Sequence, residues 1–577
     1  MKLIEALKIL REALPPDAEP LTVFLACGFM PGHLETFLAA HLRRLCPSKA
    51  VTMETGLYGD LAGSLGRLTT SSAQAAAIVI EWPDLDPRLG LRSLGGWRPE
   101  QLPDILATAQ ARLRQYLDGL AAAAGRMPVA LLLPSLPLPP FAHTSGSQMS
   151  PVAAGVQQAV ATAAAEAAQM DNVRLANPQR LDARSPLGGR LDAKSELMSG
   201  FPYAPAHADA VAELLVSLLQ PPAPKKGLIT DLDDTLWRGI LGEVGVDGVS
   251  WDLDHHSQMH GLYQQLLHSL AEAGVLIAVA SRNDLALTQD AFARPDRVLP
   301  ADRVFPMEVH WGRKSESVAR ILDAWNIAAD SVVFVDDSPM ELAEVGAAYP
   351  DITCLPFPTR DDQAAYALLE QLRDLFGKER VSDEDGIRLG SLRSASHLRE
   401  HTTAGTDPDR FLADAQATLA LDFSKAPDPR AFELINKTNQ FNLNGRRLGE
   451  AEWQARLAAP DTFLLVAAYE DKFGPLGKIA AILGRAEASG PVVDTWVMSC
   501  RAFGRRIEHR CLEHLFAKLD AETIHLDFAP TERNRPLQEF LASFLGAVPE
   551  GGFALSHAQF AAKCPPLFHD VKEPSVA

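Results

Sequence analysis

Two aspartates spaced i, i+2 follow a short apolar stretch near the middle of the chain. Residues 228–230 have strand character, and Asp231 and Asp233 come directly after them. Successive strand side chains point to opposite faces, but the chain bends where a strand ends, so these two carboxylates can converge. Converging carboxylates suit Mg2+, and they can divide the roles of nucleophile and general acid/base. The same spacing also occurs in ordinary acidic turns, so other segments of the chain are needed to distinguish a catalytic site from a turn.

Three further segments place polar side chains after strands or at the start of a helix. Apolar runs at 275–280 and 331–335 each end in polar residues, and a lysine opens a stretch with helical spacing that extends to about 325. Strands that alternate with helices predict a parallel sheet, in which ligands bind beyond the carboxyl ends of the strands. The polar residues concerned are Ser281, Arg282, Asn283, Lys314, Asp336 and Asp337.

Each of these residues also has an ordinary explanation when it is taken alone. A lysine at a helix start, such as Lys314, is usually solvated, and a serine after a strand, such as Ser281, is usually a turn residue. Their common order argues against coincidence. An acid pair, a hydroxyl, a lysine and a second acid pair each follow a strand or open a helix, so we interpret them as one site.

The ordered set resembles the haloacid dehalogenase superfamily of phosphotransferases, and residues 231–243 are similar to its FkbH-like branch. The resemblance implies a Rossmann-like domain in which Asp231 is nucleophile and Mg2+ ligand. It implies Asp233 as general acid/base that also offers its backbone carbonyl to the metal. The phosphate-binding residues that it implies are Ser281, Arg282, Asn283 and Lys314, and the further metal ligands are Asp336 and Asp337.

Two positions depart from the usual wording of this branch. The branch more often has Asn at Asp234 and Lys at Arg282, and neither change removes a reacting group. A carboxylate nucleophile gives an aspartyl-phosphate that water later removes. No long insertion separates the first two strand motifs, so we expect a minimal cap and an active site open to a large partner.

Length and composition set limits on the class of protein. A chain of 577 residues is too long for one core, and 47% hydrophobic with 22% charged residues is ordinary globular usage. A formal net charge of −19, with no basic stripe, argues against nucleic-acid binding. We expect no membrane span, and six cysteines without a C-x-x-C pair argue against zinc and against a disulfide framework. A reducing cytoplasm is the expected location.

The sequence predicts an α/β chain of several domains. A Pro-rich linker closes the first block, and a charged stretch precedes the last one. The predicted parts are an SGNH-hydrolase-like domain at 1–222, the phosphatase domain at 223–375, a connector at 376–412, a GNAT-like α+β domain at 413–565 and a tail at 566–577.

The first block resembles SGNH hydrolases in its placement and in the ending around His207, but it lacks the serine that such enzymes need after the first strand. Cys27 stands near that place. Cys27 as a thiol nucleophile with His207 as its base is one interpretation. A lone cysteine after a strand usually packs as a small hydrophobe, so a docking module without chemistry is preferred.

The last block resembles a GNAT-like acyltransferase domain, the usual C-terminal companion in FkbH-like proteins. Arg506 stands where the acetyl-CoA loop needs a small residue, so an acyl chain on a phosphopantetheine arm is more attractive than coenzyme A. Cys500 follows a strand and precedes arginines and a helix start, which favour a thiolate, although a structural cysteine is the alternative. The residues predicted to bind the acyl group or pantetheine are Asn439, Asn442, Arg501, Gly504, Arg505 and Asn534.

The resemblance implies a bifunctional glyceryl transferase and phosphatase. Such a protein takes the glyceryl unit of 1,3-bisphosphoglycerate, a phosphorylated three-carbon acyl donor, and loads it as a thioester on an acyl carrier protein in polyketide-type biosynthesis. Two alternatives stay open. One is a phosphatase fused to a CoA-dependent N-acyltransferase, and the other is a scaffold that docks carrier proteins.

Overall fold

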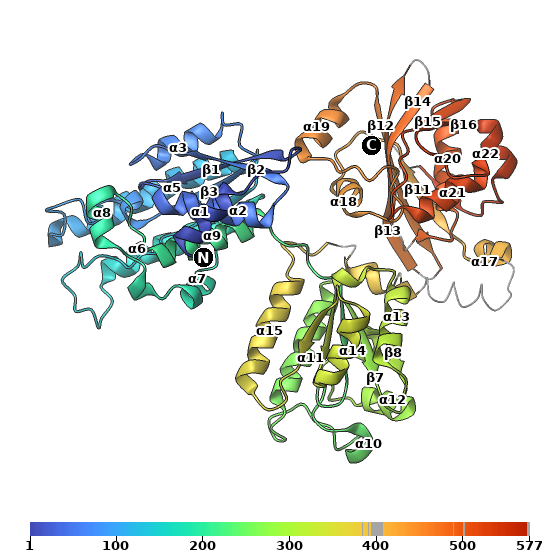
Figure 1. Ribbon diagram of the computed structural model, residues 1–577, viewed down its shortest axis with the longest axis horizontal. Coiled ribbons are helices and arrows are strands. Elements are labelled where there is room, and N and C mark those ends of the chain that lie inside the picture. Colours follow the sequence, from blue (N-terminus) through green and yellow to red (C-terminus); the bar gives the residue numbers. More distant parts are fainter. Residues whose placement is uncertain are drawn as a thin grey trace. The chain divides into compact units, whose positions relative to one another are not determined.

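The computed structural model describes residues 1–382, 385–390, 392–393, 408–472, 474–487, 490–499 and 502–573. The chain divides into two compact units, Met1–Ala223 and Pro224–Ala577, and its described residues form three separate sheets (Figure 1). The expected multidomain α/β organisation is therefore confirmed. Among the described residues, no helix combines the length and apolarity needed to cross a membrane.

The first unit contains a five-stranded parallel sheet in the order β2-β1-β3-β4-β5. The apolar stretches 21–26, 76–80 and 128–133 overlap β1, β3 and β4. The elements of this unit are α1 (Leu3–Arg11), β1 (Glu19–Cys27), α2 (Gly32–Leu45), β2 (Lys49–Thr55), α3 (Leu61–Leu68), β3 (Ala75–Val79), α4 (Trp82–Leu85), α5 (Leu102–Ala124), β4 (Val129–Leu132), α6 (Pro151–Ala167), β5 (Val173–Leu175), α7 (Pro178–Arg184), α8 (Ala193–Ser199) and α9 (Pro205–Leu219).

The second sheet has five parallel strands in the order β10-β9-β6-β7-β8. Its central strands are buried at every position, as expected when helices cover both faces of a parallel sheet. The elements are β6 (Gly227–Thr230), α10 (Leu241–Val244), α11 (Gln258–Glu272), β7 (Leu276–Ser281), α12 (Leu285–Ala293), β8 (Val304–Val309), α13 (Lys314–Trp325), β9 (Val332–Asp336), α14 (Pro339–Ala348), β10 (Thr353–Pro356) and α15 (Asp362–Phe376).

Two hydrophobic cores lie on the two faces of this sheet. On one face Leu228 and Ile277 pack with residues of α11 and α15. On the other face Ile229 and Ala278 pack with α13, including Trp325, and with α14. Side chains alternate between the two faces along β6 and β7, so neighbouring residues pack into different cores. Packing on both faces fixes the ends of these strands, where the polar residues lie.

The third sheet is mixed and has the strand order β16-β15-β14-β13-β12-β11-β17. Residues 570–572, expected in a C-terminal tail, form an edge strand paired with β11. The elements are α17 (Pro408–Asp414), β11 (Thr418–Asp422), α18 (Pro429–Lys437), α19 (Glu450–Ala458), β12 (Thr462–Asp471), β13 (Gly474–Glu487), β14 (Gly490–Met498), α20 (Ile507–Lys518), β15 (Thr523–Leu526), α21 (Arg535–Leu545), β16 (Phe553–Ser556), α22 (His557–Lys563) and β17 (Asp570–Lys572). The predicted connector at 376–412 lies partly outside the described residues.

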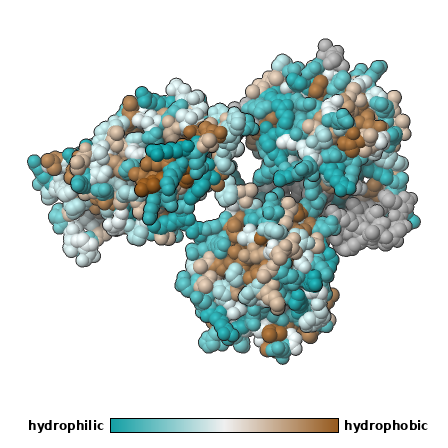
Figure 2. Space-filling view, viewed as in Figure 1, coloured by the Kyte–Doolittle hydropathy of each residue, from teal (hydrophilic) through white to brown (hydrophobic). Residues whose placement is uncertain are grey.

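Apolar side chains are gathered in separate buried cores, with at least one core for each sheet. Figure 2 shows hydrophilic residues over much of the visible face of each part, with hydrophobic residues scattered among them. This distribution agrees with three sheets that each bury their own apolar faces.

Strands β14 and β15 pair over only two residues, Val492 and Val493 of β14. Beyond that point residues 441–444 lie between β14 and the chain that follows β15. The backbone N–H of Leu443 donates to the carbonyl of Trp496 at 2.9 Å on one side, and the Leu443 carbonyl accepts from Ala529 at 3.1 Å on the other. The gap between the two strands is thus filled by the chain itself.

Two asparagines fix this inserted segment. The buried Asn534 side chain donates to the carbonyls of Asn442 at 3.0 Å and Ala529 at 2.9 Å. The buried Asn442 side chain accepts from the backbone of Gly445 at 2.8 Å and donates to Thr438. The amides of both side chains are therefore used inside the domain.

Replacing Asn534 by alanine should loosen this segment, because the buried carbonyl of Asn442 and the partly buried carbonyl of Ala529 lose their donor. A buried group left without a partner costs about 1–3 kcal/mol, so the amides of 441–444 should exchange hydrogen roughly 5- to 150-fold faster. Hydrogen-exchange mass spectrometry of the full chain measures this rate. Arg535→Ala is the control, because that side chain is exposed and pairs only with Glu539. Equal exchange in the two variants would contradict the assigned role.

Candidate active site

Asp231 and Asp336 lie at the carboxyl ends of neighbouring strands. β6 pairs with β9 in parallel, so both strands end at the same edge of the sheet. The backbone N–H of Asp231 donates to Val335 at 2.9 Å, which continues the pairing by one residue. Both carboxylates are buried. The edge of the sheet therefore concentrates two acids where water is largely excluded.

Lys314 supplies a cation between these acids. It is the first residue of α13, and it is only 2% exposed. Its Nζ lies 2.8 Å from Oδ1 of Asp231 and 2.5 Å from Oδ2 of Asp336, and it also contacts Oε2 of Glu341. Burial alone would lower the pKa of Lys314, but the three surrounding carboxylates raise it above its ordinary value. The lysine therefore remains an ammonium ion.

The same carboxylates form a group that could hold a metal ion. Ligand oxygens of Asp231, Asp336 and Glu341 all lie within 4.8 Å of one another. When all three carboxylates are ionised, the single ammonium leaves two negative charges, which a divalent cation would neutralise. Burial and the charge of Asp231 raise the pKa of Asp336 to about 7, so a bound cation would also favour its ionised form. Although Oδ1 of Asp231 lies close to Lys314, this buried oxygen has no well-directed hydrogen bond. An incompletely hydrogen-bonded oxygen within an all-oxygen donor set fits a hard cation.

Glu341 was not predicted as a site residue. It lies in the first turn of α14, five positions after Asp336. One of its oxygens contacts Lys314, and the other lies 3.2 Å from Nη1 of Arg282. The available signal was an acid in a helix that follows a strand ending in two aspartates. Only the packing of α14 turns this acid toward the site.

Asp233 lies on the bend after β6, and three donors fix its carboxylate. Its Oδ1 accepts from the indole of Trp237 at 2.9 Å and from the backbone of Leu241 at 3.1 Å. Its Oδ2 accepts from the side chain of Asn283 at 3.0 Å. Burial raises the pKa of Asp233 despite these hydrogen bonds, and the nearby charge of Asp231 raises it further. A carboxyl group with a raised pKa suits proton transfer.

The residues after β7 face this edge in different ways. Ser281 ends β7 and is buried, and the buried Asn283 contacts Asp233. Arg282 does not point to a free anion site: its guanidinium lies 3.2 Å from Glu341 and 3.3 Å from Glu344. Its predicted role as a phosphate ligand thus competes with two acids of the protein.

Asp337 lies beside Asp336 but is not part of the three-carboxylate group. Burial raises the pKa of Asp337 to about 6, with further increases from the charges of Asp231 and Asp234. Its metal-binding role stays a prediction.

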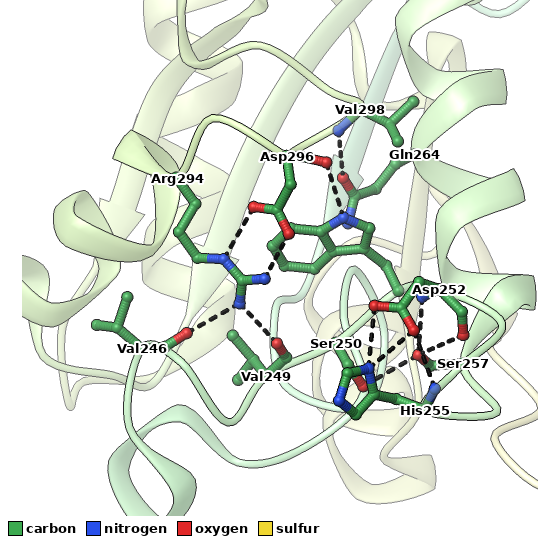
Figure 3. A network of polar contacts seen from close by, with 11 residues as sticks. Val246, Val249, Ser250, Asp252, His255, Ser257, Gln264, Arg294, Asp296 and Val298 are labelled. Atoms are coloured by element: carbon green, nitrogen blue, oxygen red, sulfur yellow. Dashed lines mark hydrogen bonds and ion pairs between the residues drawn. The ribbon is translucent and has the colours of Figure 1, made fainter.

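Arg294 fixes the segment between β6 and α11 (Figure 3). Nη1 of Arg294 donates to the carbonyls of Val246 at 3.0 Å and Val249 at 2.7 Å. The guanidinium also binds both oxygens of Asp296, and it stacks on the ring of Trp251 at 4.2 Å. This segment contains only one short helix, α10, and it is held to the body of the domain.

In the first unit, Cys27 and His207 do not form a pair. The ring nitrogens of His207 lie 3.0 Å from the hydroxyls of Ser135 and Ser185. The Cys27 thiol donates to the carbonyl of Phe29 at 3.3 Å, and burial raises the pKa of Cys27. A raised pKa disfavours the thiolate, so the structure gives no support to a thiol nucleophile here.

The residues predicted to bind an acyl group belong to the part of the chain that forms the third sheet. Cys500 and Arg501 lie outside the described residues. Asn439 is exposed and accepts from Arg447, and Gly504 has a positive φ of 78° in the turn before α20. Arg505 is buried, 3.4 Å from Asp471. Cys511 is buried in the core.

Comparison with known proteins supports the fold of this chain. No protein-family model and no curated protein matches it. A crystal structure of the N-terminal part of the protein BF1531 from Bacteroides fragilis, containing a phosphatase domain complexed with Mg, matches with a TM-score of 0.50. The two chains are 18% identical, and the match covers 66% of this chain and 100% of that chain. That share exceeds either of the two compact units.

A second solved structure is much less similar. The putative UDP-N-acetylglucosamine 2-epimerase from Listeria monocytogenes matches 67% of this chain and 98% of its own, with 10% identity and a TM-score of 0.17. A score this low carries no argument.

Replacing Lys314 by methionine tests whether the acids need a cation. The variant leaves three carboxylates facing one another, and removing one partner of a buried ion pair costs about 3–5 kcal/mol. Added Mg2+ should raise the melting temperature of the variant more than that of the wild type, because the ion replaces the lost charge. Differential scanning calorimetry measures both effects. Lys225→Met removes a lysine whose side chain binds only the Asp330 carbonyl, so it should show neither the loss of stability nor the larger response to Mg2+. An equal Mg2+-induced rise in melting temperature in Lys314→Met and the wild type would contradict the assignment.

Proposed function

We propose that the part of the chain that forms the second sheet, β6 to β10, and its covering helices is a Mg2+-dependent phosphatase of the haloacid dehalogenase type. The observation that carries this proposal is the convergence of Asp231, Asp336 and Lys314 at one buried edge of a parallel sheet. A phosphoryl group needs a nucleophile, charge neutralisation and cationic contacts to its oxygens. This edge offers residues for each need.

Asp231, Asp336 and Glu341 would hold the metal ion. When bound, Mg2+ supplies charge neutralisation for the phosphoryl oxygens. The likeness to a phosphatase domain complexed with Mg supports this choice of cation. Lys314 adds a compact positive charge, and Ser281 at the end of β7 adds a hydroxyl near the same edge.

Asp231 and Asp233 divide the chemistry. Asp231 attacks the phosphorus atom with one carboxylate oxygen, and the leaving oxygen departs on the opposite side. Asp233 carries the raised pKa, so it can donate a proton to the leaving oxygen and then take one from the water that cleaves the aspartyl-phosphate. Asn283 and Trp237 hold the Asp233 carboxyl group in one orientation for both transfers.

The finer function that we propose is glyceryl transfer. The thiol of Cys500 would attack the acyl carbon of 1,3-bisphosphoglycerate and displace the C1 phosphate, which forms a thioester. The phosphatase centre would hydrolyse the remaining C3 phosphate ester, which leaves a glyceryl thioester and two phosphate ions. The phosphopantetheine arm of an acyl carrier protein would then receive the glyceryl group. This part is supported by the resemblance of the sequence to FkbH-like proteins and by the thiolate-favouring arginines around Cys500.

Asp231→Asn should abolish phosphate release from a phosphorylated substrate while the fold remains intact. Removing one member of a covalent catalytic unit costs more than about 10³-fold in turnover. A phosphate-release assay with circular dichroism as a check on folding measures this. Asp234→Asn is the control, because Asp234 has a φ of 52°, which asparagine tolerates, and its Oδ1 accepts from Gly239. Near-wild-type turnover in Asp231→Asn would refute the phosphatase assignment.

Cys500→Ala should prevent acyl loading but spare phosphate release. Intact-mass spectrometry after incubation with 1,3-bisphosphoglycerate and Mg2+ should show a glyceryl adduct on the wild type and none on the variant. Cys564→Ala, which changes a half-buried cysteine of the same domain, should keep the adduct. An adduct that survives Cys500→Ala would exclude a thioester on Cys500. Acetyl-CoA turnover with an amine acceptor in that variant would favour an N-acyltransferase instead.

A further inference from the structure

Glu344 lies one helical turn beyond Glu341 on α14 and contacts two parts of the site. Its Oε1 accepts from the backbone of Ser315 at 3.1 Å and from the Ser315 hydroxyl at 2.8 Å. Its Oε2 accepts from Nη2 of Arg282 at 3.3 Å. Residues three apart on a helix share a face, so Glu341 and Glu344 approach the same edge of the sheet.

These contacts close a ring of side chains around the phosphatase site. Lys314 contacts Glu341, which lies 3.2 Å from Arg282. Arg282 lies 3.3 Å from Glu344, which binds Ser315, the chain neighbour of Lys314. The ring therefore links α13, α14 and the chain that follows β7. Each of these three segments carries at least one residue of the site.

Helix α13 needs an acceptor at its N-terminus, and Glu344 provides one. The residue at the capping position, Arg313, makes no side-chain hydrogen bond to the helix. The first N–H groups of a helix require partners, and a carboxylate there is also favoured by the helix dipole. Because Lys314 is the first residue of α13, an acceptor on the next residue fixes where the lysine side chain starts.

Arg282 determines which oxygen of Glu341 is available. It holds Oε1 at 3.2 Å, which leaves Oε2 for the interior of the site. Arg282 also donates to the carbonyl of Gly312 at 3.2 Å, just before α13. Without Glu344 the guanidinium would lose one of its two acids, and Glu341 would be free to turn.

We propose that Glu344 is a positioning residue that sets Lys314 and Glu341 in place through Ser315 and Arg282. The inference rests on the proposed phosphatase function. Partners behind the metal ligands orient those ligands, and their removal typically costs about 10- to 100-fold in metal affinity or activity. Glu344 contacts Ser315 and Arg282 and is not a ligand of the proposed metal site, so it acts only through the ring of side chains.

Glu344→Ala in the full chain tests the proposal. The dissociation constant for Mg2+, measured by isothermal titration calorimetry, and the Mg2+ concentration for half-maximal hydrolysis of p-nitrophenyl phosphate should both rise about 10- to 100-fold. The turnover number at saturating Mg2+ should fall less. Glu344→Gln, which keeps an acceptor for Ser315 but loses the charge for Arg282, should lie between.

Two further variants separate positioning from general damage. Arg282→Ala combined with Glu344→Ala should bind Mg2+ no more weakly than the worse single variant, because one break already opens the ring. Glu316→Ala removes an exposed acid from the same turn of α13 and should leave Mg2+ affinity unchanged. Thermal unfolding verifies that each variant folds.

The outcomes distinguish this inference from the function on which it rests. Wild-type Mg2+ affinity in both Glu344→Ala and Glu344→Gln, in a wild-type protein that releases phosphate, would overturn the positioning role alone. A wild type that binds no Mg2+ would overturn both. Weakened Mg2+ binding in Glu344→Ala, together with turnover that survives Asp231→Asn, would support the ring and refute the phosphatase mechanism.

Discussion

The contact of one buried ammonium ion with three carboxylates is the interaction on which the proposed site depends. Lys314 is almost fully buried, and Asp231, Asp336 and Glu341 surround its Nζ. Burial of any of these charges alone would be strongly unfavourable. Together they balance in part, and the remaining two negative charges create a place for a divalent cation. Electrostatics thus couples the fold of this edge to its chemistry.

The parallel sheet makes this concentration of charge possible. β6, β7 and β9 lie next to one another and end at the same edge, while α13 and α14 start there. Helix starts and strand ends bring side chains from distant parts of the sequence within hydrogen-bonding distance without any long loop. The hydrophobic cores on both faces hold the strands in register, so Asp231 and Asp336 cannot separate without breaking the β6–β9 pairing.

Much of this edge could be predicted from the sequence, because its residues directly follow apolar runs or open a helical stretch. Asp231, Asp336 and Lys314 are examples in which position along the chain determines position in space. Glu341 and Glu344 could not be predicted in this way, because an acid within a helix is normally solvated and only the packing of α14 turns both inward. Arg282 was expected to bind phosphate, and its two acidic partners could not be foreseen from spacing alone.

Edge strands and the third sheet show the same limit. β2 and β8 border their sheets and are only partly buried, and polar residues or a proline interrupt their apolar pattern. From the sequence, Asn442 and Asn534 were predicted to bind the acyl group or pantetheine. In the structure their amides hold the chain inserted beside β14, a role that depends on strand pairing and has no local sequence signal.

In the proposed mechanism, Asp231 carries the phosphoryl group during turnover. Acid quenching of the Mg2+-loaded protein during reaction with a phosphoryl donor labelled with ³²P, followed by peptide mapping, tests it most directly. Label is expected on the peptide that contains Asp231, with the acid stability and hydroxylamine sensitivity of an acyl phosphate. Phosphate release with no labelled protein at any quench time, or label on a peptide outside this strand end, would contradict it.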